Sequence, residues 1–298
     1  MLILKGASEE VDAVRFTPDG RGLIVPRWRG DQLWPDWASG GKPVAVARLA
    51  DGVECVSPNG RYALGTSGWH LTLYDLVAGT ATALDPELPA SYVVMATFTP
   101  DGRRIITSHR SSPPPHLRCT QIEAPHPVVW SVPTADPVAR LVFLDAGRFV
   151  GLEFATRHSG FVAVPYDAAT GETVGEVRVD VPYRLECLIT SPDGRCVVGH
   201  YATRLLVYQS ADLAAAPIIV RNTSRKAFSG LAFHPSGRWL AATSNDASVK
   251  LYDVATWEVT RTFDWKIGRL RSVAFTPDGT VAAAGGDKGR VVVWDFDE

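Results

Sequence analysis

A short apolar run that ends in a Pro-Asp-Gly-like turn occurs seven times along this 298-residue chain, and a second apolar run follows each turn directly. The successive spacings of the turn glycines are 40, 42, 45, 47, 43 and 42 residues, and these glycines are Gly20, Gly60, Gly102, Gly147, Gly194, Gly237 and Gly279. A period in the low forties is typical of four-stranded sheets that are repeated around an axis. The sequence therefore predicts an all-β fold, a seven-bladed β-propeller whose blades are four-stranded antiparallel sheets.

The repeat predicts a single domain over residues 1–298, because no linker rich in proline, serine or glycine separates its copies. The approximate repeats are 7–50, 51–90, 91–136, 137–180, 181–224, 225–265, and 266–298 completed by 1–6.

The segment 230–262 shows one blade most clearly. A first strand closes at 231–233, and His234-Pro235-Ser236-Gly237 turns the chain, with proline fixing a φ of about −65° and glycine supplying a positive φ. Further strands are expected at 239–243, 249–253 and 258–262, and the second of these alternates apolar and polar residues as a half-buried strand does. The four strands of a blade are named a to d in this order.

The overall charge excludes some classes of partner. A net charge of −2 argues against a general binder of nucleic acid or of anionic membranes. The first residues lack the apolar core of a secretory signal, and no stretch approaches the roughly 20 apolar residues of a membrane-spanning helix. We expect a cytoplasmic monomer that binds neither nucleic acid nor membranes.

Four cysteines, Cys55, Cys119, Cys187 and Cys196, fall on predicted strands without the CxxC spacing of metal or redox sites. We expect reduced, buried thiols. Cys187 and Cys196 flank one hairpin turn, and counting outward from that turn places Cys196 opposite Ile189.

Catalytic sequence signatures are absent. The chain has no GxSxG elbow, P-loop, HExxH motif or GxGxxG followed by a helix, and most of its acidic residues fall at turn positions. The histidines come from different turns, without the paired spacing of a zinc site. We therefore predict no enzyme activity, no cofactor and no bound metal.

Basic and aromatic residues gather in the turns between strands b and c, which in a propeller emerge on one face around the axis. The candidates for partner binding are Arg27, Trp28, Arg29, Trp69, His70, His109, Arg110, His116, Arg157, His158, Tyr201, Arg204 and Lys288. Arginine binds carboxylates and phosphates bidentately, and Trp and Arg dominate many interfaces. These turns fit an acidic or phosphorylated peptide; alternatively, they are polar only because turns are polar in any protein.

The last repeat resembles the WD-repeat (Trp-Asp repeat) family. It contains Pro277-Asp278-Gly279, then Gly286-Asp287-Lys288-Gly289, and ends strand c with Trp294-Asp295. Three other repeats end strand c similarly, with Tyr74-Asp75, Tyr166-Asp167 and Tyr252-Asp253. Because arginine far outnumbers lysine, as in proteins from GC-rich bacterial genomes, the chain is similar to a bacterial member of this family.

The resemblance implies a way of closing the propeller. The sequence stops directly after strand c of the seventh repeat, and the family suggests that Leu2-Ile3-Leu4-Lys5 supplies the missing strand d. An unpaired strand edge would otherwise be open to aggregation.

One departure from the family concerns a hydrogen-bonded group in each blade. The family typically has a Gly-His pair before strand a, whose histidine meets the aspartate of the b–c turn and a tryptophan of strand c. The stretches around Ser224 and Lys266 have no histidine. We expect this group to be incomplete in every blade, with Asp246 and Asp287 still accepting backbone N–H bonds within their own turns.

The resemblance implies a non-catalytic protein-interaction scaffold that binds peptide or protein partners on the face of the b–c turns around the central channel. The alternative is a propeller enzyme or small-ligand binder with its site at the channel mouth, since propellers host both kinds of function.

Overall fold

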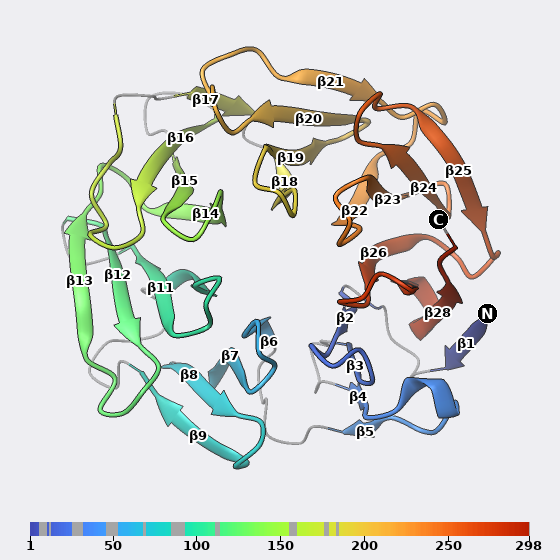
Figure 1. Ribbon diagram of the computed structural model, residues 1–298, viewed down its shortest axis with the longest axis horizontal. Helices are drawn as coiled ribbons and strands as arrows, with labels where there is room; N and C mark the ends of the chain where they lie inside the picture. Colours follow the sequence, from blue (N-terminus) through green and yellow to red (C-terminus); the bar gives the residue numbers. More distant parts are fainter. Residues whose placement is uncertain are drawn as a thin grey trace. The chain divides into compact units, whose positions relative to one another are not determined.

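The computed structural model describes residues 1–5, 11, 13–25, 32–45, 53–67, 70–84, 93–110, 114–154, 160–175, 179–182 and 185–297. The strands form seven four-stranded antiparallel sheets, and the fold is the predicted seven-bladed β-propeller (Figure 1). Helix in the described part is limited to short 3-10 turns, η1 (Trp37–Ser39) and η3 (Asp287–Gly289). Within the described residues, no helix has the length and hydrophobicity needed to traverse a lipid bilayer.

Two compact units divide the chain. The four-blade unit comprises Met1–Arg48, Leu185–Gln209 and Pro217–Glu298, and the three-blade unit comprises Leu49–Arg184 and Ser210–Ala216. The single domain over residues 1–298 stays a prediction.

The four-blade unit contains blades 5, 6, 7 and 1, with strands a to d in order. Blade 5 is β18 (Glu186–Thr190), β19 (Cys196–Tyr201), β20 (Arg204–Gln209) and β21 (Ile218–Arg221); blade 6 is β22 (Phe228–Phe233), β23 (Trp239–Ser244), β24 (Ser248–Asp253) and β25 (Val259–Asp264); blade 7 is β26 (Leu270–Phe275), β27 (Val281–Gly286), β28 (Arg290–Asp295) and β1 (Leu2–Lys5); blade 1 is β2 (Arg15–Phe16), β3 (Leu23–Val25), β4 (Gln32–Trp34) and β5 (Val44–Ala45).

The three-blade unit contains blades 2, 3 and 4. Blade 2 is β6 (Val53–Val56), β7 (Tyr62–Ser67), β8 (His70–Asp75) and β9 (Thr80–Ala83); blade 3 is β10 (Val93–Phe98), β11 (Arg104–His109), β12 (His116–Gln121) and β13 (Val128–Pro133); blade 4 is β14 (Val138–Phe143), β15 (Arg148–Phe154), β16 (Gly160–Asp167) and β17 (Val179–Pro182).

The a–b turns explain why the glycine recurs. Its φ lies between 66° and 77° in six of the seven turns, a left-handed conformation that glycine adopts without a steric penalty. The exception is Gly147 of blade 4, which lies outside that region. Its turn lacks the proline and is one residue shorter, since the Leu144 N–H donates to Arg148 O.

A repeated side-chain motif rigidifies five of these turns. A serine or threonine hydroxyl donates to an Asp or Asn Oδ1 two residues later, at 2.5 to 2.7 Å. The same Oδ1 accepts the backbone N–H two positions further on. The pairs are Thr17–Asp19, Ser57–Asn59, Thr99–Asp101, Ser191–Asp193 and Thr276–Asp278.

The N-terminal strand completes the seventh blade, as the resemblance implied. β1 pairs antiparallel with β28, with Leu2 opposite Val293 and Lys5 opposite Arg290 (Figure 1). Leu4 is buried in a cluster with Val291 and Val293, whereas Ile3 is exposed on the other face of the strand.

None of the four cysteines forms a disulfide, as expected, but only Cys119 and Cys196 are buried, while Cys55 and Cys187 are half-buried. The predicted register at the Cys187–Cys196 hairpin is wrong by two positions. Ile189 pairs with Val198, because the Ser191 N–H donates to Cys196 O and thereby closes a turn of four intervening residues.

Candidate functional site

Each sheet has two ends with different connections. The b–c turns and the d–a loops lie at one end, here called the b–c end, and the a–b and c–d turns lie at the other, the a–b end. In the four-blade unit, backbone N–H groups join successive segments of the b–c end. Phe228 donates to Ala202 O at 2.8 Å, Asn245 to Ala227 O at 2.9 Å, and Asp287 to Arg269 O at 2.9 Å. The b–c turns of blades 5, 6 and 7 are therefore each hydrogen-bonded to a neighbouring d–a loop or strand start.

Several predicted site residues lie outside the described residues, namely Arg27, Trp28, Arg29, Trp69, Arg157 and His158. His70 is the first residue of β8. The arrangement of the remaining candidates divides between the two units.

In the three-blade unit, the structure brings His109, Arg110 and His116 together at the b–c turn of blade 3. The ring of His109 stacks on that of His116 with centroids 4.5 Å apart, and His109 Nε2 lies 2.7 Å from Thr107 Oγ1. His109 is buried rather than displayed in the turn. Burial, with smaller effects of His116 and Arg118, lowers the pKa of His109 to about 4, so the ring is neutral at physiological pH.

Arg110 follows His109 and is exposed, with its guanidinium 6.0 Å from the ring centre of Phe154 in blade 4. This contact is at the outer limit of a cation–π interaction, and it leaves the charge available at the surface. At the b–c end of blade 3, Arg110 is therefore exposed and His116 is half-buried, with His109 buried against the His116 ring.

In the four-blade unit, Tyr201 and Arg204 face each other as cross-strand partners of β19 and β20. Arg204 also faces Arg221 of β21, a residue that the sequence analysis did not select. Arg221 ends a strand d and therefore falls outside the b–c turns, from which the candidate residues were predicted.

Blade 7 contributes Lys288, which is exposed in η3 with a φ of 73°. Beside it, Asp287 accepts a hydrogen bond from Arg271 Nε at 3.0 Å. Asp287 is the first residue after strand b of its blade, whereas Asp246 is the second residue after strand b of blade 6. The Asp287 carboxylate therefore contacts the Arg271 side chain of strand a.

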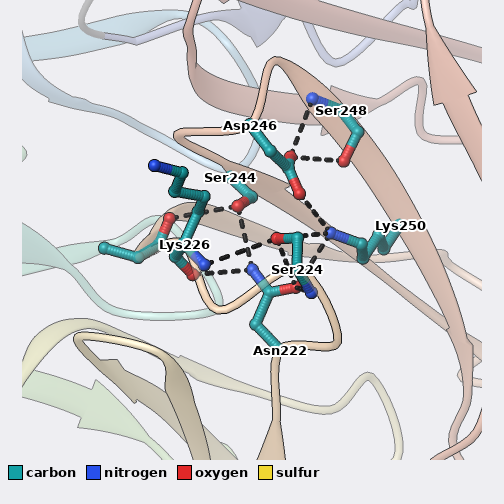
Figure 2. Close-up of polar contacts among 8 residues, drawn as sticks. Asn222, Ser224, Lys226, Ser244, Asp246, Ser248 and Lys250 are labelled. Carbon is teal, nitrogen blue, oxygen red and sulfur yellow. Dashed lines mark hydrogen bonds and ion pairs between the residues drawn. The ribbon is translucent and has the colours of Figure 1, made fainter.

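A polar network without histidine lies at the b–c end of blade 6 (Figure 2). Lys250 Nζ donates to Asp246 Oδ2 at 2.6 Å, to Asn222 Oδ1 at 2.8 Å and to Ser224 Oγ at 3.3 Å. Asn222 Nδ2 in turn donates to Ser244 Oγ at 2.9 Å and to the backbone oxygen of Lys226 at 2.8 Å. The d–a loop is thereby fixed to strands b and c without a histidine.

Asp246 holds the centre of this network as a carboxylate. It accepts the backbone N–H of Ser248 at 3.1 Å, which confirms the predicted bond within its own turn. Burial alone would raise its pKa, but hydrogen bonds from Lys250, Ser224 and Ser248 outweigh burial and hold the pKa well below the usual range. Burial and the nearby charge of Asp246 also raise the pKa of Tyr252 to about 12.

Concave surface lies at the opposite end of the sheets. In the three-blade unit, a groove of about 600 Å³ between blades 2 and 3 is lined at the a–b end by Asn59, Arg61, Asp101, Arg103, Arg104 and Glu123. In the four-blade unit, a groove of about 380 Å³ between blades 5 and 6 is lined by Asp193, Arg195, Arg238, Asp253 and Trp257. Both grooves mix cations with carboxylates and so carry little net charge.

His234 forms a polar contact between two blades that the sequence did not predict. Its Nδ1 lies 2.7 Å from Ser236 Oγ in its own a–b turn, and its Nε2 lies 3.0 Å from Gly279 O in the a–b turn of blade 7. The ring also stacks on Phe296. His234 therefore links two blades at the end opposite to the predicted site.

Comparison with known proteins finds similarity in the last blades. The family described as "WD domain, G-beta repeat" matches residues 220–253 and 257–295. Each match runs through strands d, a, b and c, ending with Tyr252-Asp253 or Trp294-Asp295.

A second similarity is to "Target of rapamycin complex subunit wat1" of Schizosaccharomyces pombe, with 26% identity over 111 residues. The aligned part covers 37% of this chain and 35% of that protein, so it spans about a third of the relative's length. Blades 6 and 7 thus match the WD-repeat family, within a chain that folds as a seven-bladed propeller.

Proposed function

We propose that the whole chain is a WD-repeat propeller that acts as a non-catalytic scaffold and binds a protein partner at the b–c end of its blades. The single observation that carries this proposal is the separation of charge between the two ends of the sheets in the four-blade unit.

Among the described residues of this unit, cations dominate the b–c end. They are Lys5, Arg204, Arg221, Arg225, Lys226, Lys266, Arg269, Arg271, Lys288 and Arg290, against the carboxylates Glu186, Asp246, Asp264 and Asp287. Three of these carboxylates are paired already: Asp246 with Lys250, Asp264 with Lys266, and Asp287 with Arg271. The described part of the b–c end therefore keeps an excess of unneutralised positive charge.

The a–b end of the same unit has the opposite balance. Among its described residues the carboxylates are Asp19, Asp36, Asp193, Asp253, Glu258, Asp278, Asp295 and Asp297, against the cations Arg21, Lys42, Arg195 and Arg238. A protein of net charge −2 with one basic end attracts acidic surfaces to that end and repels them from the other.

The b–c end is also preorganised for binding. Its loops are fixed by backbone hydrogen bonds and by the buried network of Asn222, Asp246 and Lys250, so little conformational entropy is lost when a partner docks. The name of the fission-yeast relative describes a subunit of a complex, and this favours protein partners here as well.

Affinity purification of the tagged full chain from its native cells, followed by mass spectrometry, tests this proposal. A variant with Arg225→Glu, Arg269→Glu and Lys288→Glu reverses charge at the b–c end and should lose the partner. A matched variant with Arg21→Glu, Arg103→Glu and Arg195→Glu reverses the same charge in exposed a–b turns and should retain it. Equal recovery by both variants, or loss by the second alone, would contradict binding at the b–c end.

A further inference from the structure

Blade 5 carries a row of three side chains across its sheet at the b–c end. Tyr201 of β19 is the cross-strand partner of Arg204 of β20, and Arg204 is the partner of Arg221 of β21. Directly opposed residues project to the same face of an antiparallel sheet, so the phenol and the two guanidinium groups share one face.

The two arginines oppose each other without a compensating carboxylate. Like charges placed directly across a strand pair destabilise the sheet. Within the part of the chain that the structure describes, neither arginine forms an ion pair. Glu186, the acidic residue at this end of the blade, pairs with His200, which neighbours Tyr201 and so projects to the other face. The pair is therefore unfavourable in the free protein and available to an anion.

Two more cations stand on the loop that follows β21. The Asn222 N–H donates to Thr203 O at 2.8 Å and the Arg225 N–H to Asn222 O at 3.1 Å, which folds the loop back against the b–c turn of blade 5. Arg225 and Lys226 are both exposed, and Arg225 is held at a φ of 58°. Such a backbone conformation is unfavourable for arginine and persists only where its surroundings impose it.

The loop is held in place by the buried network beneath it. Asn222 is buried and bonded to Lys250 and Ser244, while the ammonium group of Lys226 lies outside the network and is reached by none of its hydrogen bonds (Figure 2). The cations at the surface are thus supported by a rigid layer that does not neutralise them.

We infer that this corner of blade 5, the row of Tyr201, Arg204 and Arg221, binds a phosphorylated serine or threonine in a segment of the partner protein. Arg225 and Lys226 on the following loop add positive charge at the same end of the blade. This inference rests on the scaffold function proposed above and assigns a ligand class to one part of the b–c end.

A phosphate group suits the corner better than a single carboxylate does. A phosphoryl group carries a charge of about −1.5 to −2 at neutral pH and three acceptor oxygens. Two guanidinium groups side by side can each bind it bidentately, and the Tyr201 hydroxyl adds a donor.

The edge of β21 favours a peptide as the carrier of the phosphate. β21 is the outermost strand of blade 5, and Ile218 and Ile219 are both exposed, although isoleucine is usually buried. Ile219 precedes Arg221 by two residues and so lies on the same face of the strand. An extended segment with an apolar residue beside its phosphorylated residue would cover both.

Fluorescence anisotropy with degenerate peptide libraries tests the inference on the full chain. One library fixes phosphothreonine among random neighbours, a second fixes threonine, and a third fixes glutamate. We expect the first to bind at least tenfold more tightly than either of the others. Equal binding of the phosphothreonine and threonine libraries would overturn the site, and equal binding of the glutamate library would overturn the assignment of phosphate.

Paired substitutions locate the site. Arg204→Gln with Arg221→Gln should abolish the preference for phosphothreonine, and Arg204→Lys with Arg221→Lys should reduce it at least threefold, because lysine keeps the charge but not the bidentate geometry. The matched control is Arg21→Gln with Arg195→Gln, which removes the same charge from exposed a–b turns at the opposite end of the sheets. A preference that survives the glutamine change, or is lost equally in the control, would refute the site.

Thermal melting and the binding of native partners distinguish a failure of the phosphate site from a failure of the scaffold proposal. Thermal melts establish that each variant is folded, and if the glutamine pair fails to fold, the lysine pair decides. If native partners remain bound to a folded glutamine variant, the scaffold proposal stands and the phosphate site is wrong. If no partner binds even the unmodified chain, the scaffold proposal itself fails.

Discussion

At the scale of single residues, Lys250 has the most unusual environment. It is a buried lysine on strand c, bonded to Asp246, Asn222 and Ser224. The alternation of residues 249–253 places Lys250 on the polar face of the strand, which the sequence analysis treated as half-buried. The d–a loop covers that face, and an alternation pattern cannot report which loop folds over a strand.

Removing this ammonium group should strongly destabilise the protein. Lys250→Met leaves the Asp246 carboxylate and the Asn222 oxygen without their strongest donor, and breaking a buried pair from one side costs roughly 3–5 kcal/mol. Lys250→Met combined with Asp246→Asn removes both charges and should recover part of this loss. Urea unfolding followed by tryptophan fluorescence measures both effects, and a loss below about 1 kcal/mol in the single variant would show that the network contributes little.

His234 provides a second residue-level prediction. His234→Ala removes the bond to Gly279 O and the stacking on Phe296, and the lost hydrogen bond and buried ring together should cost about 2–4 kcal/mol. His234→Thr restores the hydroxyl that other blades use at this position, and it should be more stable than the alanine variant. If alanine and threonine melt alike, the intrablade hydrogen bond is unimportant and only the contact between blades matters.

Sequence alone could predict the site only in part. Tyr201, Arg204 and Lys288 were predicted as candidates because they lie in or beside b–c turns, but Arg221, Arg225 and Arg269 belong to strand d and the d–a loops. Which loops share an end follows from topology, whereas cross-strand partners such as Arg204 and Arg221 depend on register. The burial of His109 was unpredictable because the turn pattern does not show which ring the strands cover.

At the scale of elements, the blade was predicted almost completely. In blade 6 the expected strands at 239–243, 249–253 and 258–262 correspond to β23, β24 and β25, with differences of one or two residues at their ends. The turns made this possible, since proline and glycine impose backbone angles locally. In blade 4 the a–b turn lacks proline, and it is one residue shorter than the other a–b turns.

Deleting residues 1–5 tests the role of β1 in blade 7. The deletion exposes Val291 and Val293 and removes the buried Leu4, so we expect the melting temperature to fall by roughly 5–15 °C. Leu4→Ala should reproduce part of this fall, while Ile3→Ala, on the exposed face, should change stability by less than about 1 kcal/mol. A truncated chain that melts with the full chain would mean that β1 does not stabilise the blade.

At the scale of the whole molecule, the a–b turns make stability depend on pH. Hydrogen bonds from Thr17, Ser191 and Thr276 lower the pKa values of Asp19, Asp193 and Asp278 below their usual value of 3.8. A carboxylate whose pKa is lowered by folding stabilises the folded state above its unfolded pKa, and this contribution is lost as the pH falls from about 4 through the lowered pKa.

Blade 2 supplies the control for this effect, because Asn59 makes the same turn bonds without a charge. The combined variant Asp19→Asn, Asp193→Asn and Asp278→Asn should keep the fold and lose less stability than the unmodified chain between pH 5 and pH 2.5. Melting curves across this range measure the difference. Identical pH profiles would mean that these turns contribute nothing to acid sensitivity.

Binding at the b–c end is tested most sharply by hydrogen–deuterium exchange of the full chain with and without its purified native partner. We predict that the partner slows exchange in the b–c turns and d–a loops, foremost in residues 201–204 and 222–227, and leaves exchange in the a–b turns unchanged. Protection confined to the a–b turns and to the grooves between blades at that end would contradict this prediction.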